Sequence, residues 1–179
     1  QVIQEVLRGK TIALISDAGT PGISDPGYLL VHEALKQGVK VECLPGPTAL
    51  IPALVQSGLP IDRFVFEGFL PPKKGRQGRL KQMAEESRTT VFYESPHKII
   101  KTLGQMLPYF GPQRKLAVVR ELSKKFESNF RGSLEEAVHF FEEHPPKGEF
   151  VIVVEGTKNK KYVVASGKPS RRFKSAGVG

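Results

Sequence analysis

Three short segments hold the residues best suited to bind a small ligand. They are the loop 16–27, dense in glycine, proline, aspartate and serine, the turn Pro45-Gly-Pro-Thr48, and the run Glu94-Ser-Pro-His97. Glycines let a backbone approach a ligand closely, and prolines stiffen loops, so little ordering entropy is lost on binding. Asp17 offers a carboxylate to a sulfonium or hydroxyl, and Thr48 offers a hydroxyl to a carboxylate or ribose. Taken singly, each segment could also be an ordinary turn.

Several common kinds of site are not encoded in the sequence. It contains no GxGxxG, no Walker lysine motif and no GxSxG, which argues against an ordinary dinucleotide, P-loop or serine-hydrolase site. The four histidines do not have a metal-ligand spacing, so no metal is predicted. Cys43 is the only cysteine, which excludes an internal disulfide, and we expect it to be a small buried apolar residue.

A basic segment, Pro71 to Lys81, is a second feature with functional potential. It has five basic residues, no acidic ones, two glycines and two prolines. Such a loop suits contacts with phosphates, which orient RNA without reading its sequence, although a solvated loop would look similar. The net charge of +9 is a weaker signal, because residues 158–179 hold seven basic and no acidic residues. The RNA-binding prediction rests on Lys73, Lys74, Arg76 and Arg79.

The elements that would position these segments alternate between strands and helices, which predicts an α/β fold. Predicted strands cover residues 11–15, 39–44, 64–69, 89–93, 115–121, 125–131 and 149–154. Helices are predicted at residues 2–7 and 28–37, and a third follows Thr48 as its cap. Three more run from the end of the 70–78 loop to about Ser87, from Ser95 to about Tyr109, and from the capping box at Ser133 to about Glu143. In open α/β sheets, ligands bind beyond the carboxyl ends of strands. The three loops follow predicted strands, so we expect them to converge on one site.

Six sequence blocks, in order, resemble the ribosomal RNA small subunit methyltransferase I family of the tetrapyrrole methylase superfamily. The similarity covers roughly residues 1–156, and the first block is very specific. The blocks are Ala13-Leu-Ile-Ser-Asp-Ala-Gly-Thr-Pro-Gly-Ile-Ser-Asp-Pro-Gly27, Leu44-Pro-Gly-Pro-Thr-Ala49, Phe66-Glu-Gly-Phe-Leu-Pro71, Phe92-Tyr-Glu-Ser-Pro-His97, Arg120-Glu-Leu122 and Lys147-Gly-Glu-Phe-Val-Ile-Val-Val-Glu-Gly156.

The resemblance implies a two-domain tetrapyrrole-methylase fold. Residues 1–60 would form an N-terminal α/β domain with a mainly parallel sheet, residues 61–156 a C-terminal α/β domain with a mixed sheet, and residues 157–179 a basic tail. Family members begin with a strand and a Gly-Thr-Pro-Ile-Gly-Asn-Leu loop that this chain lacks. We therefore expect the N-terminal domain to be truncated at its start and to miss its first strand, which puts the activity of this chain in question.

The resemblance also implies a function. It predicts S-adenosylmethionine-dependent 2′-O-methylation of a cytidine ribose in the 16S rRNA of the 30S subunit, by a cytoplasmic homodimer without a membrane span. The cofactor would be held between the domains by Asp17, Thr20, Pro21, Gly22, Ile23, Ser24, Pro45, Gly46, Thr48, Ala49, Phe92, Tyr93, Glu94, Ser95 and Pro96. The strand end at Glu155 and Gly156 is a further candidate. Polar candidates for a catalytic role are Asp25, Glu94, Arg120 and Glu121. A structural Arg120–Glu121 ion pair is an equal expectation.

Two other functions stay open at this point. A methylase of a small tetrapyrrole or of diphthamide would share the fold, and the basic segment argues mildly against it. A truncated, non-catalytic RNA-binding module would share the basic segment but would bind no cofactor.

Overall fold

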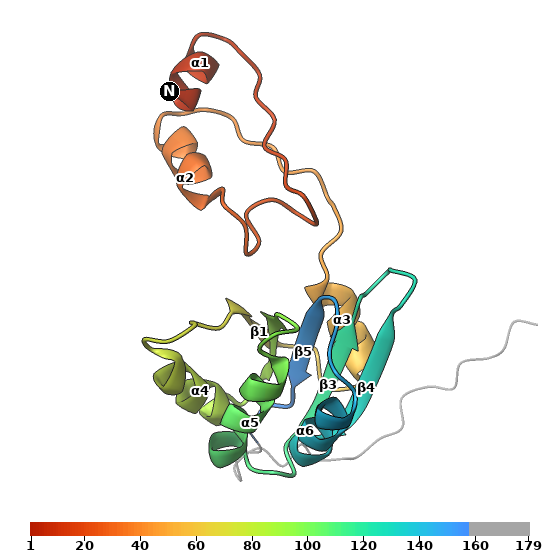
Figure 1. Cartoon of the computed structure of the whole chain (residues 1–179). Helices are drawn as coiled ribbons and strands as arrows, with labels where there is room; N and C mark the ends of the chain where they lie inside the picture. The colour runs from red at the N-terminus through yellow and green to blue at the C-terminus, as the bar shows by residue number, and fades with distance from the viewer. Residues whose placement is uncertain (158–179) are drawn as a thin grey trace, which may run out of the picture.

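The computed structural model describes residues 1–157, so the basic tail predicted from the sequence lies almost wholly outside the described residues. Within them the chain forms six helices and five strands, as Figure 1 shows. The elements are α1 (Val2–Leu7), α2 (Tyr28–Lys36), α3 (Leu50–Ser57), β1 (Phe64–Phe69), α4 (Arg76–Glu85), β2 (Thr89–Glu94), α5 (Ile99–Phe110), β3 (Lys115–Arg120), β4 (Ser128–Ser133), α6 (Leu134–Glu143) and β5 (Phe150–Val154).

The five strands form one mixed sheet in the order β1-β2-β5-β3-β4. β1 pairs with β2 in parallel, whereas β5 runs antiparallel to both of its neighbours, β2 and β3, and β4 runs antiparallel to β3. Its central strand, β5, is apolar and buried along its whole length, as a strand covered on both faces must be. The α/β fold with a mixed sheet in the C-terminal part is confirmed.

One face of the sheet is covered by α4, α5 and α6 (Figure 1). α5 and α6 are strongly amphipathic and turn their apolar stripes toward the strands. The core on this side includes Leu80, Ile99, Leu103, Phe92 and Ile152, all of which are almost completely buried. Burial of each such side chain contributes about 1.5–3 kcal/mol. This layer fixes the carboxyl ends of β2 and β3 in place.

Within residues 1–157, α3 is the helix that covers the opposite face of the sheet. Its residues Leu50, Ala53 and Leu54 pack against Val119 and Val153 of the central strands. This helix, which lies in the predicted N-terminal domain of residues 1–60, thus shares its core with the C-terminal sheet. Because α3 starts directly after the turn 45–48, its packing anchors that turn beside the sheet.

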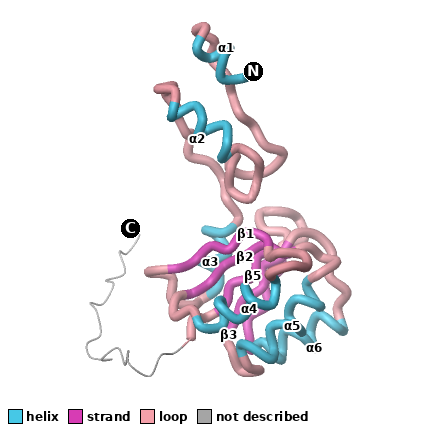
Figure 2. Tube along the Cα trace, turned by 90° about the vertical axis from the view of Figure 1, so that its left-hand side faces the viewer, coloured by secondary structure: helices cyan, strands magenta, loops and turns pink. Residues whose placement is uncertain are grey.

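α1 and α2 lie near each other and away from the sheet, and only part of the loop between them comes close to it (Figures 1 and 2). The strands predicted at 11–15 and 39–44 are wrong for this structure: both segments are extended but neither belongs to a sheet within the described residues. A strand is stable only when its backbone pairs with a neighbour, and neither segment has one. Ile15 and Leu44 are consequently more than four-fifths exposed. Cys43, expected to be buried, is exposed for the same reason.

The observed helix starts agree with the sequence signals at one of three predicted positions. Ser133 accepts a hydrogen bond from the Glu136 N–H while the Glu136 side chain accepts from the Ser133 N–H, which confirms the capping box. Thr48 does not cap α3, whose first flanking residue is Ala49. α5 begins at Ile99 instead of Ser95, because residues 95–98 form a turn closed on the Ser95 carbonyl.

Candidate functional site

One large cavity, of about 780 Å³, lies where the three predicted segments meet. Its lining comes from residues 18–20 and 23–25, from residues 46–49 and 51–52, and from residues 93–96 at the end of β2. Two further segments complete it, residues 122–124 after β3 and residues 149–151 at the start of β5. The volume falls within the range typical of sites for small molecules and cofactors. We call it the large cavity.

The structure brings most of the predicted cofactor residues to this cavity. Its lining includes Thr20, Ile23, Ser24, Gly46, Thr48, Ala49, Tyr93, Glu94, Ser95 and Pro96, together with the catalytic candidate Asp25. The lining does not include Asp17, Pro21, Gly22, Pro45 or Phe92. Phe92 is fully buried under the α4–α6 layer because side chains alternate along a strand, which sends its neighbour Tyr93 to the cavity side. Within the loop 16–27, Asp25 lines the cavity and Asp17 does not.

The loop 16–27 and the turn 45–48 are held together by direct contacts. The Thr20 hydroxyl donates to the Pro47 carbonyl at 3.1 Å, and a Cβ on Gly46 would lie 3.5 Å from that hydroxyl oxygen. Ser24 has a left-handed backbone, with φ of 60°, an uncommon conformation for a residue with a side chain. A Cβ on Gly68 of β1 would lie 3.2 Å from the Ser24 hydroxyl, so this loop also reaches the sheet.

An aromatic wall closes the cavity on the β1–β2 side. The rings of Phe69 and Tyr93, which both line the cavity, meet edge to face with centroids 5.5 Å apart. Tyr93 also meets Phe66 at 5.1 Å. Phe69 is 58% exposed although it is a large apolar residue, so one side of its ring faces open space. The wall offers a flat apolar surface to a planar ring system.

Glu94 and Arg76 form a buried ion pair. The pair argues against the predicted RNA contact of Arg76 and against a catalytic role for the Glu94 carboxylate. The Arg76 guanidinium lies 3.4 Å from the Glu94 carboxylate, and the Thr102 hydroxyl donates to the same oxygen at 2.6 Å. The guanidinium further donates to Gln105 and to the Pro71 carbonyl. Arg76 is therefore not accessible to RNA phosphates, and the carboxylate of Glu94 is occupied as an acceptor. Both side chains hold the basic segment and the end of β2 together.

Lys124, Glu121 and Glu149 form an ionic cluster at the edge of the large cavity. The Lys124 ammonium lies 3.0 Å from Glu149 and 3.2 Å from Glu121, and the Glu121 carboxylate accepts from the Glu149 N–H at 2.8 Å. That backbone hydrogen bond, followed by Lys124, holds the pKa of Glu121 below its usual value. Glu121 and Ser123 both have left-handed backbones. Such strained residues persist where surrounding contacts fix them, and they are frequent at functional sites.

The predicted Arg120–Glu121 ion pair is not formed. Arg120 instead donates from Nε to the Lys147 carbonyl at 2.6 Å, and it lines a different, smaller cavity. Sequence reasoning missed Lys124 and Glu149, which line the large cavity. The missed signal is Glu149, the last residue before an apolar strand. Glu149 precedes β5, whereas ligands are expected beyond the carboxyl ends of parallel strands. Because β5 is antiparallel to β2 and β3, its amino end lies beside their carboxyl ends, which brings Glu149 to the site.

Of the four cations predicted to bind RNA, three reach the surface of the basic segment. Lys73 and Lys74 are exposed, and Arg79 is half-exposed and pairs with Glu67 at 2.9 Å. Among residues 1–157, no helix has the length and apolarity needed to cross a membrane, and no group of three or more acidic, cysteine or histidine side chains could hold a metal ion.

Several known proteins are similar to this chain. Residues 1–138 match the model of the tetrapyrrole (corrin/porphyrin) methylases. The chain is 48% identical over 157 residues to "Ribosomal RNA small subunit methyltransferase I" of Synechocystis sp., covering 87% of this chain and 56% of the relative. It is 44% identical to the Thermotoga maritima protein of the same name, covering 86% of this chain and 71% of the relative. The chain thus spans little more than half the length of several such relatives.

Solved structures show the same fold. The methyltransferase CobJ has a TM-score of 0.64 at 19% identity, covering 86% of this chain and 68% of CobJ. A uroporphyrin-III C-methyl transferase from Thermus thermophilus, complexed with S-adenyl homocysteine, has a TM-score of 0.57 at 22% identity, covering 85% of this chain and 69% of that one. With the family match over residues 1–138 and the identity to the Thermotoga maritima protein, these findings show that the chain belongs to the tetrapyrrole (corrin/porphyrin) methylase family, on the branch of the proteins named ribosomal RNA small subunit methyltransferase I.

Proposed function

We propose that this chain is the cofactor-binding part of an S-adenosylmethionine-dependent methyltransferase that methylates the 2′-oxygen of a cytidine ribose in 16S rRNA. The observation that supports it most is the large cavity, in which three stiff loops distant in sequence converge next to an aromatic wall. The family supports the methyltransferase chemistry, and the names of the relatives support rRNA as the substrate.

The residues around the cavity fit such a cofactor. Gly46 leaves its backbone open beside Thr20 and Thr48, whose hydroxyls can bond an amino-acid or ribose group. The wall of Phe69 and Tyr93 suits an adenine ring. We therefore assign the loop 16–27 to the methionine and sulfonium, and the segments 45–49 and 92–96 to the ribose and adenine. When bound, the cofactor supplies an activated methyl group.

The chain itself must align the acceptor and manage its proton. Fixing two reactants in a near-attack geometry can contribute about 7–11 kcal/mol in favourable cases. Of the four polar candidates, we propose Asp25 as the group that receives the hydroxyl proton, because it lines the cavity in a loop that reaches the sheet. Glu94 is buried in an ion pair, and neither Arg120 nor Glu121 lines the large cavity.

The RNA would be held by exposed cations of the basic segment. We assign phosphate contacts to Lys73, Lys74 and Arg79, whereas Arg76 is buried and pairs with Glu94. The family resemblance supports the 30S subunit in the cytoplasm as the site of action and a homodimer as the assembly, both as part of this proposal.

A pair of glycine variants tests the cofactor site. Gly46→Val places a branched side chain in the large cavity, whereas Gly104→Val adds the same group to an exposed position of α5 with no heavy atom within 4 Å of a Cβ. Isothermal titration with S-adenosylmethionine should show saturable binding for the chain and for Gly104→Val, and at least about tenfold weaker binding for Gly46→Val. Absence of saturable binding to the unaltered chain would favour the non-catalytic RNA-binding module.

Substrate choice is tested separately with labelled cofactor. Incubation with 30S subunits should transfer label to a cytidine 2′-oxygen, and incubation with a corrin precursor or with a diphthamide intermediate should not. Transfer to either small substrate and not to RNA would replace the rRNA proposal with the alternative enzyme.

A further inference from the structure

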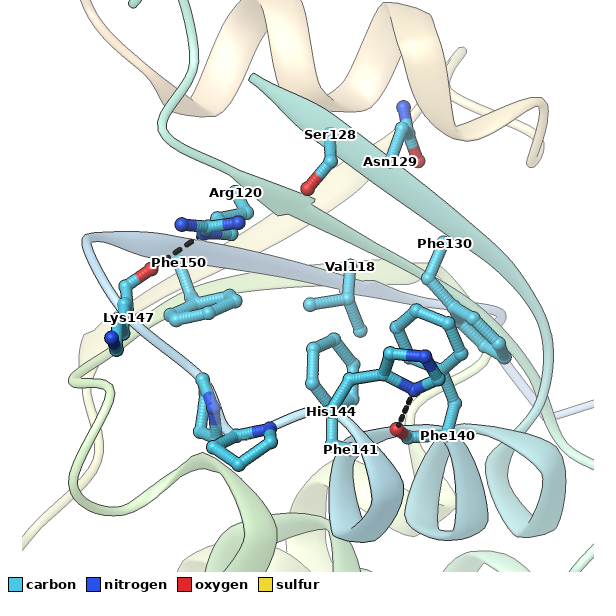
Figure 3. A pocket seen from close by; sticks show the side chains of 12 residues that line it. Val118, Arg120, Ser128, Asn129, Phe130, Phe140, Phe141, His144, Lys147 and Phe150 are labelled. Atoms are coloured by element: carbon cyan, nitrogen blue, oxygen red, sulfur yellow. Dashed lines mark hydrogen bonds between the residues drawn. The ribbon is translucent and has the colours of Figure 1, made fainter. Parts of the chain in front are cut away.

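A second, smaller cavity of about 190 Å³ lies on the other face of the sheet, and Figure 3 shows it from close by. It is lined by Val118, Arg120, Ser128, Asn129, Phe130, Phe140, Phe141, His144, Pro145, Pro146, Lys147 and Phe150. We call it the aromatic cavity. Nothing in the proposed methyl transfer at the large cavity uses these residues, apart from Phe150, which lines both.

The two cavities lie at the same end of the sheet but on opposite faces. Arg120 at the end of β3 is in register with Ser128 of β4 and with Phe150 of β5, and Phe150 is in register with Glu94 at the end of β2. Along β5, the Phe150 side chain packs into the core under α4–α6, whereas Val151 packs into the core under α3. One strand end therefore separates the large cavity from the aromatic cavity.

The aromatic cavity has walls that suit a single flat ring. Phe130 and Phe140 have ring centroids 5.1 Å apart, and His144 stacks on Phe140 at 4.5 Å with an interplanar angle of 18°. The histidine ring is held there because its Nδ1 lies 2.9 Å from the Phe140 carbonyl oxygen. Phe140 keeps 38% of its surface exposed, so the wall is accessible. Aromatic side chains of this kind are the usual platform for unstacked bases.

The rim of the aromatic cavity is cationic. Arg120 and Lys147 both line it, and none of its lining residues is acidic. Arg120 is fixed by its Nε hydrogen bond to the Lys147 carbonyl (Figure 3), so its two terminal nitrogens can hydrogen-bond an anion, which would compete with the electrostatic attraction between Arg120 and Glu121. The Lys147 side chain is exposed. A flat apolar wall beside a fixed guanidinium matches the two parts of a nucleotide, its base and its phosphate.

We infer that the aromatic cavity binds one unstacked nucleotide of a single-stranded RNA segment, with the base against His144, Phe130 and Phe140 and the phosphate at Arg120 and Lys147. This inference rests on the proposed function, which makes RNA the occupant. An RNA segment that crosses this end of the sheet would place one nucleotide on each face. A volume of about 190 Å³ is smaller than a usual small-molecule site, so the cavity has room for one ring system and not for a folded segment. The cavity would hold a neighbour of the methylated nucleotide and help to fix its register.

Nuclear magnetic resonance titration of the full chain with cytidine 5′-monophosphate tests this inference. Saturable shifts are expected at residues 128–130 and 144–150, with weaker binding of cytidine and of inorganic phosphate. Lys147→Glu should weaken binding about tenfold and His144→Ala severalfold, because each removes one contact. Lys101→Glu is the control, since it makes the same charge change at an exposed position of α5 outside the aromatic cavity.

Three outcomes would overturn the inference. They are no saturable binding at these residues, equal binding of inorganic phosphate and of the nucleotide, and equal weakening by Lys147→Glu and Lys101→Glu. Titration of the same samples with S-adenosylmethionine separates this result from the proposed function. Nucleotide binding without cofactor binding would support the nucleotide site and reject the methyltransferase. Cofactor binding without nucleotide binding would support the methyltransferase and reject the nucleotide site.

Discussion

At the scale of single residues, the buried group of Arg76, Glu94 and Thr102 shows how a basic residue of a surface-like segment can serve the fold. Removing one partner of a buried ion pair leaves an uncompensated charge. Glu94→Gln should therefore lower the free energy of unfolding by about 3–5 kcal/mol, measured by urea denaturation.

The matched control for this variant is Glu67→Gln. Glu67 pairs with Arg79 at 2.9 Å, and the two side chains are 11% and 48% exposed, so this pair is partly open to solvent and its loss should be clearly smaller than that of the buried pair. Equal losses for Glu67→Gln and Glu94→Gln would contradict the structural role of the buried pair.

Glu86 makes the response to acid testable at a single carboxylate. Hydrogen bonds from the Arg88 side chain, and then from the Arg88 N–H, lower the pKa of Glu86 from 4.5 to about 2. A depressed carboxyl pKa contributes stability that is present above the unfolded value and is lost as the pH falls toward the folded value. Denaturation of the chain and of Glu86→Gln should show a difference in unfolding free energy at pH 7 that shrinks between pH 4.5 and 2. A difference independent of pH would refute this assignment.

At the scale of elements, the capping box of α6 predicts a defined stability change. Ser133→Ala removes the acceptor for the Glu136 N–H, so the free energy of unfolding should fall by about 1 kcal/mol. Ser128→Ala at the exposed start of β4 serves as the control and should change it by less than about 0.5 kcal/mol. Urea denaturation of both variants checks the prediction, and equal effects would mean that the cap is not formed.

At the scale of the whole molecule, the large cavity depends on contact between two parts that differ in backbone hydrogen bonding. Residues 10–27 and 38–47 make few backbone hydrogen bonds, whereas β2 and β5 are paired on both sides. Amide hydrogen exchange should therefore be fast in the first two segments and slow in the two strands. Addition of S-adenosylmethionine should slow exchange at residues 18–25 and 46–49. Unchanged exchange there at saturating cofactor would place the ligand elsewhere.

Local sequence signals were sufficient to predict many of the observed helices and strands. Apolar periodicity located α2, β1, β3 and β5 to within a residue or two, and the Ser133 capping box located α6. The composition of the loops indicated which of them would form the large cavity. These features depend on neighbours a few residues away, and the chain order of the six blocks sufficed to indicate the family.

Tertiary structure decided the remainder, because it depends on which distant segments become neighbours. The apolar pattern of residues 11–15 is that of a strand, yet a strand forms only beside a partner, and periodicity does not supply one. The insertion of β5 between β2 and β3 brought Glu149 and Lys124 to the large cavity. Likewise, the charge of Arg76 suggested an RNA contact until packing placed it beside Glu94. Long-range pairing determines burial, and burial determines whether a charged side chain serves the fold or a ligand.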